Sequence, residues 1–141
     1  MTDTSSSIRK DVLIVDDEPS IRNLLKKMNE REGFLCDAAS NGREALDHLR
    51  RTSYQVALID YKMPGMTGLE LIRKIKQDPK NKGITIILVS SALPPHLDPV
   101  IRASADIDEI IPKSLLSKEL IRKLRSRIAC VDPETEESGM K

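Results

Sequence analysis

Five short apolar runs, each followed by a segment with helical features, constrain the fold of this chain more than any other feature. The runs are interpreted as β-strands because short, β-branched runs are typical of strands buried in a parallel sheet. They occupy residues 12–15, 34–40, 54–60, 84–90 and 107–112. Regular alternation of strands and helices predicts an α/β fold, a doubly wound five-stranded parallel sheet with five helices in a three-layer sandwich.

The segments between these runs carry helix start and stop signals. Apolar residues recur at helical spacing within residues 21–28, 45–49, 69–75 and 120–128. Pro19 suits the first turn of the first helix, and Gly33 ends it. A further helix is expected after the fourth strand, with Asp98 as its cap and Pro99 in its first turn. The last helix is expected to start at Ser117.

Composition limits the partners that this chain can take. Its 141 residues suit a single domain, and aromatic residues are only 2% of the chain, too few for a base-stacking nucleic-acid module. A net charge of +1 gives no bulk attraction to nucleic acid or to membranes. No apolar run is long enough to span a membrane. Cys36 and Cys130 have no metal or redox spacing, and an ordinary buried thiol at Cys36 favours a cytoplasmic location.

The two ends of the chain differ in composition from the segment between them. Residues 1–9 are small and polar and are expected to be a disordered N-terminal tail. Residues 10–130 carry the alternating pattern and form the predicted domain. Residues 131–141 include the sequence DPETEESGMK and are expected to be an acidic C-terminal tail or the start of a linker.

Polar side chains with a specific chemistry follow the predicted strands. Asp16 and Asp17 come after the first strand, and Asp60, Ser90 and Lys113 end or follow the third, fourth and fifth. Functional groups of parallel sheets collect at the carboxyl ends of strands, so these side chains are expected to converge. Carboxylates hold Mg²⁺, a hydroxyl and an ammonium stabilise a phosphoryl group, and one carboxylate can accept it.

Four blocks of the sequence resemble the receiver domain of two-component response regulators. The blocks are VLIVDDEP, VALIDYKMPGMTGLELI, IILVSSA and IIPKS, and together they span roughly residues 10–128. The chain is most similar to a chemotaxis-type, stand-alone receiver. The resemblance implies a flavodoxin-like sheet with strand order 2-1-3-4-5. It also implies a phosphorylation-dependent signalling switch rather than an enzyme, with phosphotransfer and autodephosphorylation catalysed by the domain on itself.

The resemblance assigns a role to each matching residue. Asp60 is the expected phosphoacceptor, and Asp16 and Asp17 with Asp60 are expected to bind Mg²⁺, Asp17 more directly than Asp16. The backbone carbonyl of Lys62 completes the expected metal site, while its side chain either tunes hydrolysis of the phosphoryl group or is simply solvated.

Two further residues complete the expected site. Ser90 is the expected switch hydroxyl, with Ser91 as the alternative, and Lys113 is the expected phosphate-binding amine.

Partners follow from the same resemblance. The expected phosphodonor is a histidine kinase or a phosphotransfer protein, and the expected output surface is the face formed by helix 4, strand 5 and helix 5. We expect a monomer or a weak phosphorylation-dependent dimer, without direct binding to nucleic acid or membrane. The sequence leaves open whether the chain is complete or a fragment of a longer regulator.

The sequence departs from the family at the fifth strand. Ser114 follows Lys113 where the family usually has proline, so we expect a trans peptide bond there. Ile110 occupies the position of the usual aromatic residue, so we expect a smaller conformational change. Proline residues in SALPPHLDPV are expected to shorten helix 4.

Two competing functions remain on the sequence alone. The main alternative is a receiver-like protein-interaction module that works without phosphorylation. The departures from the family at Ser114 and Ile110 favour it. A DNA-binding regulator is the other, because the last helix contains five cations against one acid. Net charge and the lack of a DNA-binding motif favour a solvated helix face or a protein-docking surface instead.

Overall fold

The computed structural model describes residues 8–91, 95, 97–115 and 118–128. The tails at residues 1–7 and 129–141, with Cys130, lie outside the described residues. So do residues 92–94, 96 and 116–117, and with them the predicted helix start at Ser117. The expected disorder of the two tails therefore stays a prediction.

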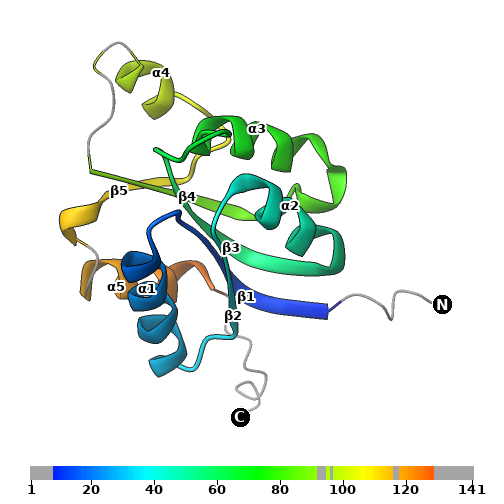
Figure 1. Cartoon of the computed structure of the whole chain (residues 1–141), viewed down its shortest axis with the longest axis vertical. Coiled ribbons are helices and arrows are strands. Elements are labelled where there is room, and N and C mark those ends of the chain that lie inside the picture. The colour runs from blue at the N-terminus through cyan, green and yellow to red at the C-terminus, as the bar shows by residue number, and fades with distance from the viewer. Residues whose placement is uncertain (1–7, 92–94, 96, 116–117, 129–141) are drawn as a thin grey trace.

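Five parallel strands form one sheet in the order β2-β1-β3-β4-β5 (Figure 1). The strands are β1 (Ile8–Val15), β2 (Cys36–Ala39), β3 (Thr52–Asp60), β4 (Thr85–Ser90) and β5 (Glu109–Pro112). The helices are α1 (Pro19–Arg31), α2 (Gly42–Arg51), α3 (Gly68–Gln77), α4 (Asp98–Arg102) and α5 (Lys118–Arg127). Two short 3-10 turns, η1 (Pro79–Asn81) and η2 (Lys113–Leu115), precede β4 and α5. The predicted fold class and strand order are confirmed.

Helices cover both faces of the sheet and create two predominantly aliphatic cores. On one face, Leu13 and Ile59 of the sheet pack in a buried cluster with residues of α2, α3 and α4. On the other face, Ile14 and Leu58 pack with residues of α1 and α5. Successive strand residues point to opposite faces, so both faces of an apolar run are buried. This explains why the strands read as continuous hydrophobic segments.

Several boundaries differ from the sequence prediction. Ile8 and Arg9 belong to β1 and pair with Thr52 and Ser53, so the domain begins earlier than residue 10. Strand β2 is shorter than the predicted 34–40, because Phe34 completes the end of α1 instead. Its amide donates to the carbonyl of Asn29 at 3.0 Å across the glycine at position 33.

Gly33 ends α1 as predicted, through a left-handed turn. Its φ is +87°, a conformation that glycine adopts without the steric penalty of a Cβ atom. The Gly33 amide donates to the carbonyl of Glu30 at 3.0 Å. Together with the bond from Phe34, this is the Schellman pattern, which satisfies the free carbonyls of the last helical turn.

The prediction that Asp98 caps α4 is wrong. Leu97 occupies the cap position and makes no side-chain hydrogen bond, while Asp98 is the first helical residue. The Asp98 carboxylate instead accepts from Arg102, one turn further on. Pro99 does lie in the first turn, and α4 has only 5 residues, as the prolines predicted. Strand β5 starts at Glu109 rather than at residue 107.

Candidate functional site

The parallel register brings the ends of four strands to one edge of the sheet, which we call the carboxyl edge. Asp60 pairs with Val89 across β3 and β4, and Ser90 pairs with Pro112 across β4 and β5. Asp16 follows the last residue of β1, and Lys113 follows the last residue of β5. The structure therefore places these predicted site residues at the carboxyl edge, as the topology required.

Three carboxylates converge at this edge. One oxygen of each of Asp16, Asp17 and Asp60 lies within 4.8 Å of the other two. Asp16 is only 1% exposed and Asp60 only 3% exposed, whereas Asp17 is exposed to solvent. Two of the three like charges are thus held together away from water, where their repulsion is strong.

Lys113 is the cation that faces the two buried acids. Its Nζ lies 3.6 Å from Asp16 Oδ2 and 3.5 Å from Asp60 Oδ1. Burial opposes the charge on Lys113, but the two carboxylates outweigh it, and its pKa is raised. One ammonium cannot neutralise three carboxylates, so the site retains net negative charge.

The pKa of Asp60 reports this imbalance. Burial raises the Asp60 pKa from 3.8 to about 6, and the neighbouring charge of Asp16 adds to the effect. Lys113 and the backbone amide of Lys62 act in the opposite direction without cancelling it. Burial also raises the pKa of Asp16, although its hydrogen bond from the Glu18 amide opposes the shift. A further positive charge in the site would favour the ionised form of both acids and lower their pKa values.

The donor set suits a hard divalent cation. All three side chains offer carboxylate oxygens, which Mg²⁺ prefers, and Asp17 leaves one side open to solvent. A bound cation would relieve the repulsion from Asp16, which adds to burial in raising the pKa of Asp60. The Lys62 backbone carbonyl as a further ligand stays a prediction.

Asp16 is held by two contacts that the sequence analysis missed. The backbone amide of Glu18 donates to Asp16 Oδ1 at 2.9 Å. Arg22 Nη1 donates to the backbone carbonyl oxygen of Asp16, also at 2.9 Å. Arg22 lies six residues beyond Asp16, near the start of α1, and no sequence motif singles it out. These contacts fix the direction of the loop that carries the acids.

Gly68 supports the backbone of the expected phosphoacceptor. Its amide donates to the Tyr61 carbonyl at 2.8 Å. A Cβ atom at position 68 would lie 2.4 Å from the carbonyl oxygen of Asp60 and 2.9 Å from Tyr61 Cα. Thr67 and Glu70 form a capping box at the same helix start. The start of α3 therefore packs directly on the end of β3, and a glycine is required for that approach.

Ser90 and Ser91 occupy different environments. Ser90 is the last residue of β4 and is only 7% exposed, whereas Ser91 is exposed. This difference favours Ser90 as the hydroxyl of the site, although its role stays a prediction.

The structure also describes the residues at which the fifth strand differs from the usual family sequence. Ile110 pairs with Leu88 and is half-buried against the core that includes α4. None of the described peptide bonds is cis, the bond between Lys113 and Ser114 included. The position of Lys113 between the acids therefore does not depend on the family proline.

Four of the five cations of α5 form ion pairs within the domain. Lys123 and Arg127 both contact Glu109, Arg125 contacts Glu32, and Arg122 contacts Glu119. These ion pairs leave little free charge for a phosphate backbone on the described part of α5, which supports the solvated-face interpretation over a DNA-binding one.

Known proteins match most of this chain in sequence. Residues 12–125 match the family model described as response regulator receiver domain. The transcriptional regulatory protein ResD of Bacillus subtilis is 33% identical over 82% of this chain and 46% of its own length. The DNA-binding response regulator MtrA of Mycolicibacterium smegmatis is 29% identical over 86% of this chain and 52% of its own length. The chain thus spans about half the length of these curated relatives.

Solved structures share the fold. The response regulator TrrA of Thermotoga maritima, solved in complex with Mg²⁺-BeF, has a TM-score of 0.73 and 37% identity over 84% of this chain and 99% of its own. A CheY-like receiver domain protein from Methanospirillum hungatei has a TM-score of 0.75 and 28% identity over 94% of this chain and 100% of its own. Among the described residues, none of the helices combines the length and apolar character that a membrane crossing needs.

Proposed function

The chain belongs to the response regulator receiver domain family of two-component systems, and we propose that it is a phosphorylation-dependent switch with Asp60 as the phosphoacceptor. One observation carries the proposal. The buried Asp60 carboxylate lies 3.5 Å from the Lys113 amine and within 4.8 Å of two further carboxylates. A nucleophile, a cation for phosphoryl oxygens and a metal-binding set are therefore adjacent.

Each residue has a defined part in the proposed reaction. A carboxylate oxygen of Asp60 forms a bond to phosphorus while the bond between phosphorus and the donor nitrogen breaks. Lys113 and the Ser90 hydroxyl stabilise the phosphoryl oxygens in the product. Mg²⁺ held by Asp16, Asp17, Asp60 and the Lys62 carbonyl would neutralise charge on the acids and the phosphoryl group. The similar TrrA was solved in complex with Mg²⁺-BeF, which supports Mg²⁺ as the ion of this site.

The proposed output follows from the position of the two phosphate-binding residues. Ser90 ends β4 and Lys113 follows β5, so a new attraction to a phosphoryl group pulls on the loops before α4 and α5. We place the downstream protein target on the face formed by α4, β5 and α5. Ile110 has no aromatic ring to reorient, and a smaller rearrangement is expected there than in members with Tyr or Phe.

The proposed donor is a histidine kinase or a phosphotransfer protein in the cytoplasm. Because the relatives ResD and MtrA are about twice as long as the matched region, activities of their remaining parts are not transferred to this chain. A phosphorylation-independent module is the competing proposal. Ile110 and Ser114, which differ from the usual family residues, favour it. It does not explain why two acids are buried side by side at the carboxyl edge.

Intact mass spectrometry distinguishes the two proposals. The protein is incubated with Mg²⁺ and acetyl phosphate, beside an Asp60→Asn variant and a sample treated with a chelator. One added phosphoryl group in the wild type alone supports the switch. Unchanged mass in every sample, combined with no binding of a stable phosphoryl mimic in the presence of Mg²⁺, would establish the phosphorylation-independent module instead.

A further inference from the structure

The acidic segment near the end of the sequence takes no part in the site described above. Residues 132–137 contain four acids and no cation, namely Asp132, Glu134, Glu136 and Glu137. We propose that this segment binds, within the same molecule, to a basic cleft at the amino-terminal edge of the sheet. This inference is independent of the proposed phosphorylation, because the cleft lies at the opposite edge from Asp60.

The cleft, which we call the amino-edge cleft, is formed where β3 and β4 begin and has a volume of about 450 Å³. Arg9 of β1, Lys80 of η1 and Arg127 of α5 line it, and none of its described lining residues is a carboxylate. All three cations are exposed. Glu109 is paired with Arg127 and Asp11 accepts a hydrogen bond from the lining residue Gln55, so Arg9 and Lys80 are the lining cations that can raise the local concentration of anionic groups.

The positive charge of the cleft is only partly used inside the domain. Lys80 Nζ donates to the backbone carbonyl of Arg50 at 3.3 Å, and no acid among the described residues forms an ion pair with it. Arg9 forms no ion pair with any described residue. Arg127 is paired with Glu109, so among the described residues the positive charge of the cleft that has no ion pair comes from Arg9 and Lys80. The cleft therefore retains net positive charge for a further anionic partner.

Connectivity favours the chain's own acidic segment as that partner. Arg127 both ends α5 and lines the cleft, and Asp132 follows it by five positions. Five residues span at most about 17 Å, so Asp132 is within reach of the cleft that Arg127 lines. A short tether of this kind gives an effective concentration on the order of millimolar, which makes weak ion pairs sufficient.

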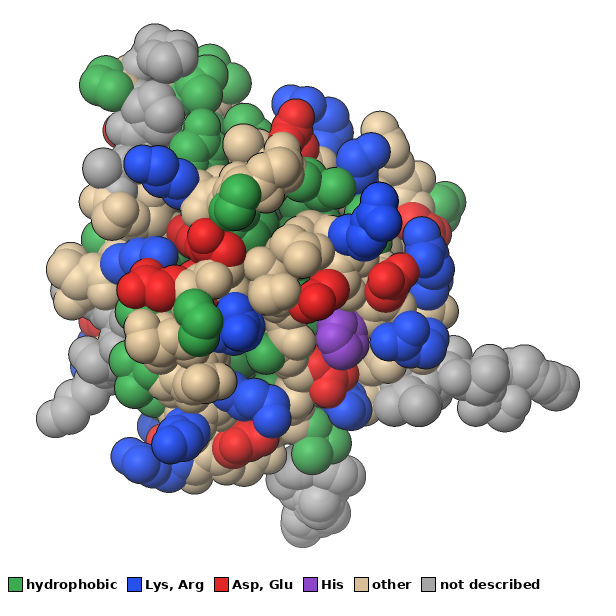
Figure 2. Space-filling view, in the orientation of Figure 1, with side chains coloured by type: hydrophobic (Ala, Val, Ile, Leu, Met, Phe, Trp, Pro, Cys, Tyr) green, Lys and Arg blue, Asp and Glu red, His purple; other side chains and the backbone are tan. Residues whose placement is uncertain are grey.

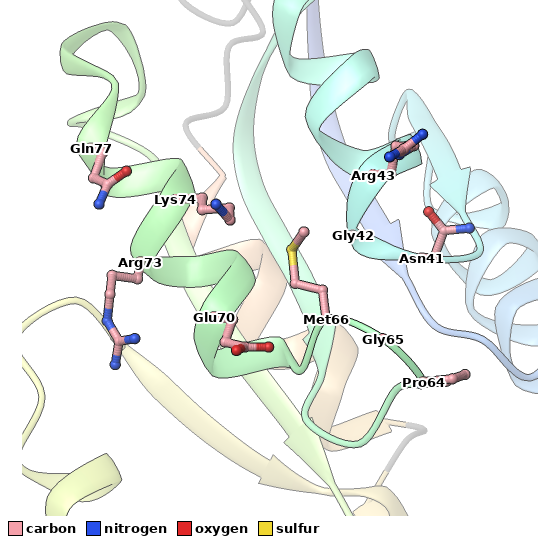
Figure 3. A pocket seen from close by; sticks show the side chains of 10 residues that line it. All are labelled: Asn41, Gly42, Arg43, Pro64, Gly65, Met66, Glu70, Arg73, Lys74 and Gln77. Atoms are coloured by element: carbon pink, nitrogen blue, oxygen red, sulfur yellow. The ribbon is translucent and has the colours of Figure 1, made fainter.

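A second hollow, between α2 and α3, is the main competitor on the described surface. It has a volume of about 710 Å³, and Arg43, Arg73 and Lys74 line it (Figure 3). Lys and Arg side chains also gather over α2 and α3 in Figure 2. However, Glu70 lines this hollow as well, and Arg43 and Arg73 lie on its opposite sides. It lacks both the acid-free lining and the direct connection to α5, and it therefore serves as the control surface.

Paramagnetic relaxation in the full chain tests the proposal. The protein carries the substitutions Ser138→Cys and Cys130→Ser, a nitroxide is attached to the introduced thiol, and backbone amide intensities are read by NMR. Cys36 stays unlabelled because it is buried, and burial raises its pKa to about 11. At low salt we expect roughly half of the amide intensity of Ser53, Gly83 and Thr85 to be lost, with recovery at about 1 M salt, where the screening length is only about 3 Å.

Matched charge reversals complete the experiment. The pair Arg9→Glu and Lys80→Glu should abolish the broadening in the cleft, whereas the pair Arg73→Glu and Lys74→Glu should leave it unchanged. Uniform absence of broadening at low salt, or broadening centred on Lys74, would overturn the proposal. A mixing experiment provides one more test, in which isotope-labelled protein without nitroxide is mixed with unlabelled protein that carries the nitroxide. Broadening of the cleft amides in this mixture would also overturn the proposal, because it assigns the contact to a second copy.

Discussion

The two edges of the sheet collect charge in opposite ways. At the carboxyl edge, Asp16 and Asp60 are 1% and 3% exposed and share the single ammonium of Lys113. At the amino edge, Arg9 and Lys80 are exposed and lie in water. Like charges that are buried together repel strongly and shift their pKa values, whereas solvated like charges interact weakly. The first arrangement is a site that needs a cation, and the second is a surface that attracts anions.

Backbone packing provides the largest test of this difference. Gly68→Ala should destabilise the protein by about 3 kcal/mol, because the added Cβ collides with the rigid backbone of Asp60 at the carboxyl edge. Gly83 at the amino edge is the matched control, since a Cβ there meets no atom within 4 Å. Gly83→Ala should change stability by less than about 0.5 kcal/mol. Equal effects in urea unfolding would contradict the close packing of α3 on β3.

The pH dependence of stability should reveal the buried acid pair. Because the Asp60 pKa is raised from 3.8 to about 6, the folded state binds more protons than the unfolded state between these values. The contribution of Asp60 to stability without divalent cations therefore falls as pH rises through this window. At pH 7, Asp60→Asn should be more stable than the wild type by about 2 kcal/mol, and at pH 4 the two should be nearly equal.

Urea unfolding of both proteins in a chelating buffer measures this difference. Comparison with the variant removes the contributions of other acids, such as Asp37 and Glu109, whose pKa values are lowered. A stability difference between the two proteins that does not change with pH would show that folding does not raise the pKa of Asp60.

Metal addition should have a smaller effect at the same edge. Mg²⁺ at about ten times its dissociation constant should stabilise the wild type by about 1 kcal/mol, because it binds the folded acid cluster. Asp17→Asn removes one of the three clustered carboxylates and should reduce the gain, while Lys80→Gln at the amino edge should retain it. Thermal unfolding with and without Mg²⁺ measures the effect. An equal gain in the Asp17→Asn protein would place the ion elsewhere.

Charge removal at the amino edge should have the smallest effect on stability. Lys80→Gln should change the free energy of unfolding by less than about 0.5 kcal/mol, since exposed charges contribute little. Its matched counterpart is Lys113→Gln, which removes the cation between two buried acids and should destabilise the metal-free protein by more. Chemical unfolding at neutral pH compares the pair. A larger loss for Lys80→Gln would reverse the contrast between the two edges.

Much of the fold followed from local sequence pattern. The five strands and their parallel arrangement were predicted because hydrophobic periodicity and β-branched runs depend on residues near one another in the chain. Element ends were less certain: Asp98 was predicted to cap α4, but its carboxylate accepts from Arg102 instead. The start of β2 was misplaced at Phe34 because the Schellman turn at Gly33 includes that residue.

Sequence by itself determined which charged groups lie at the carboxyl edge, because Asp16, Asp17, Asp60 and Lys113 each lie at the end of a recognisable strand. Only the tertiary structure decided how those groups are held. It placed Lys113 between two buried acids, Arg22 on the Asp16 carbonyl, and the start of α3 directly against the Asp60 backbone. Burial and distance depend on which strands are neighbours, and strand neighbours are set by contacts between residues far apart in the chain.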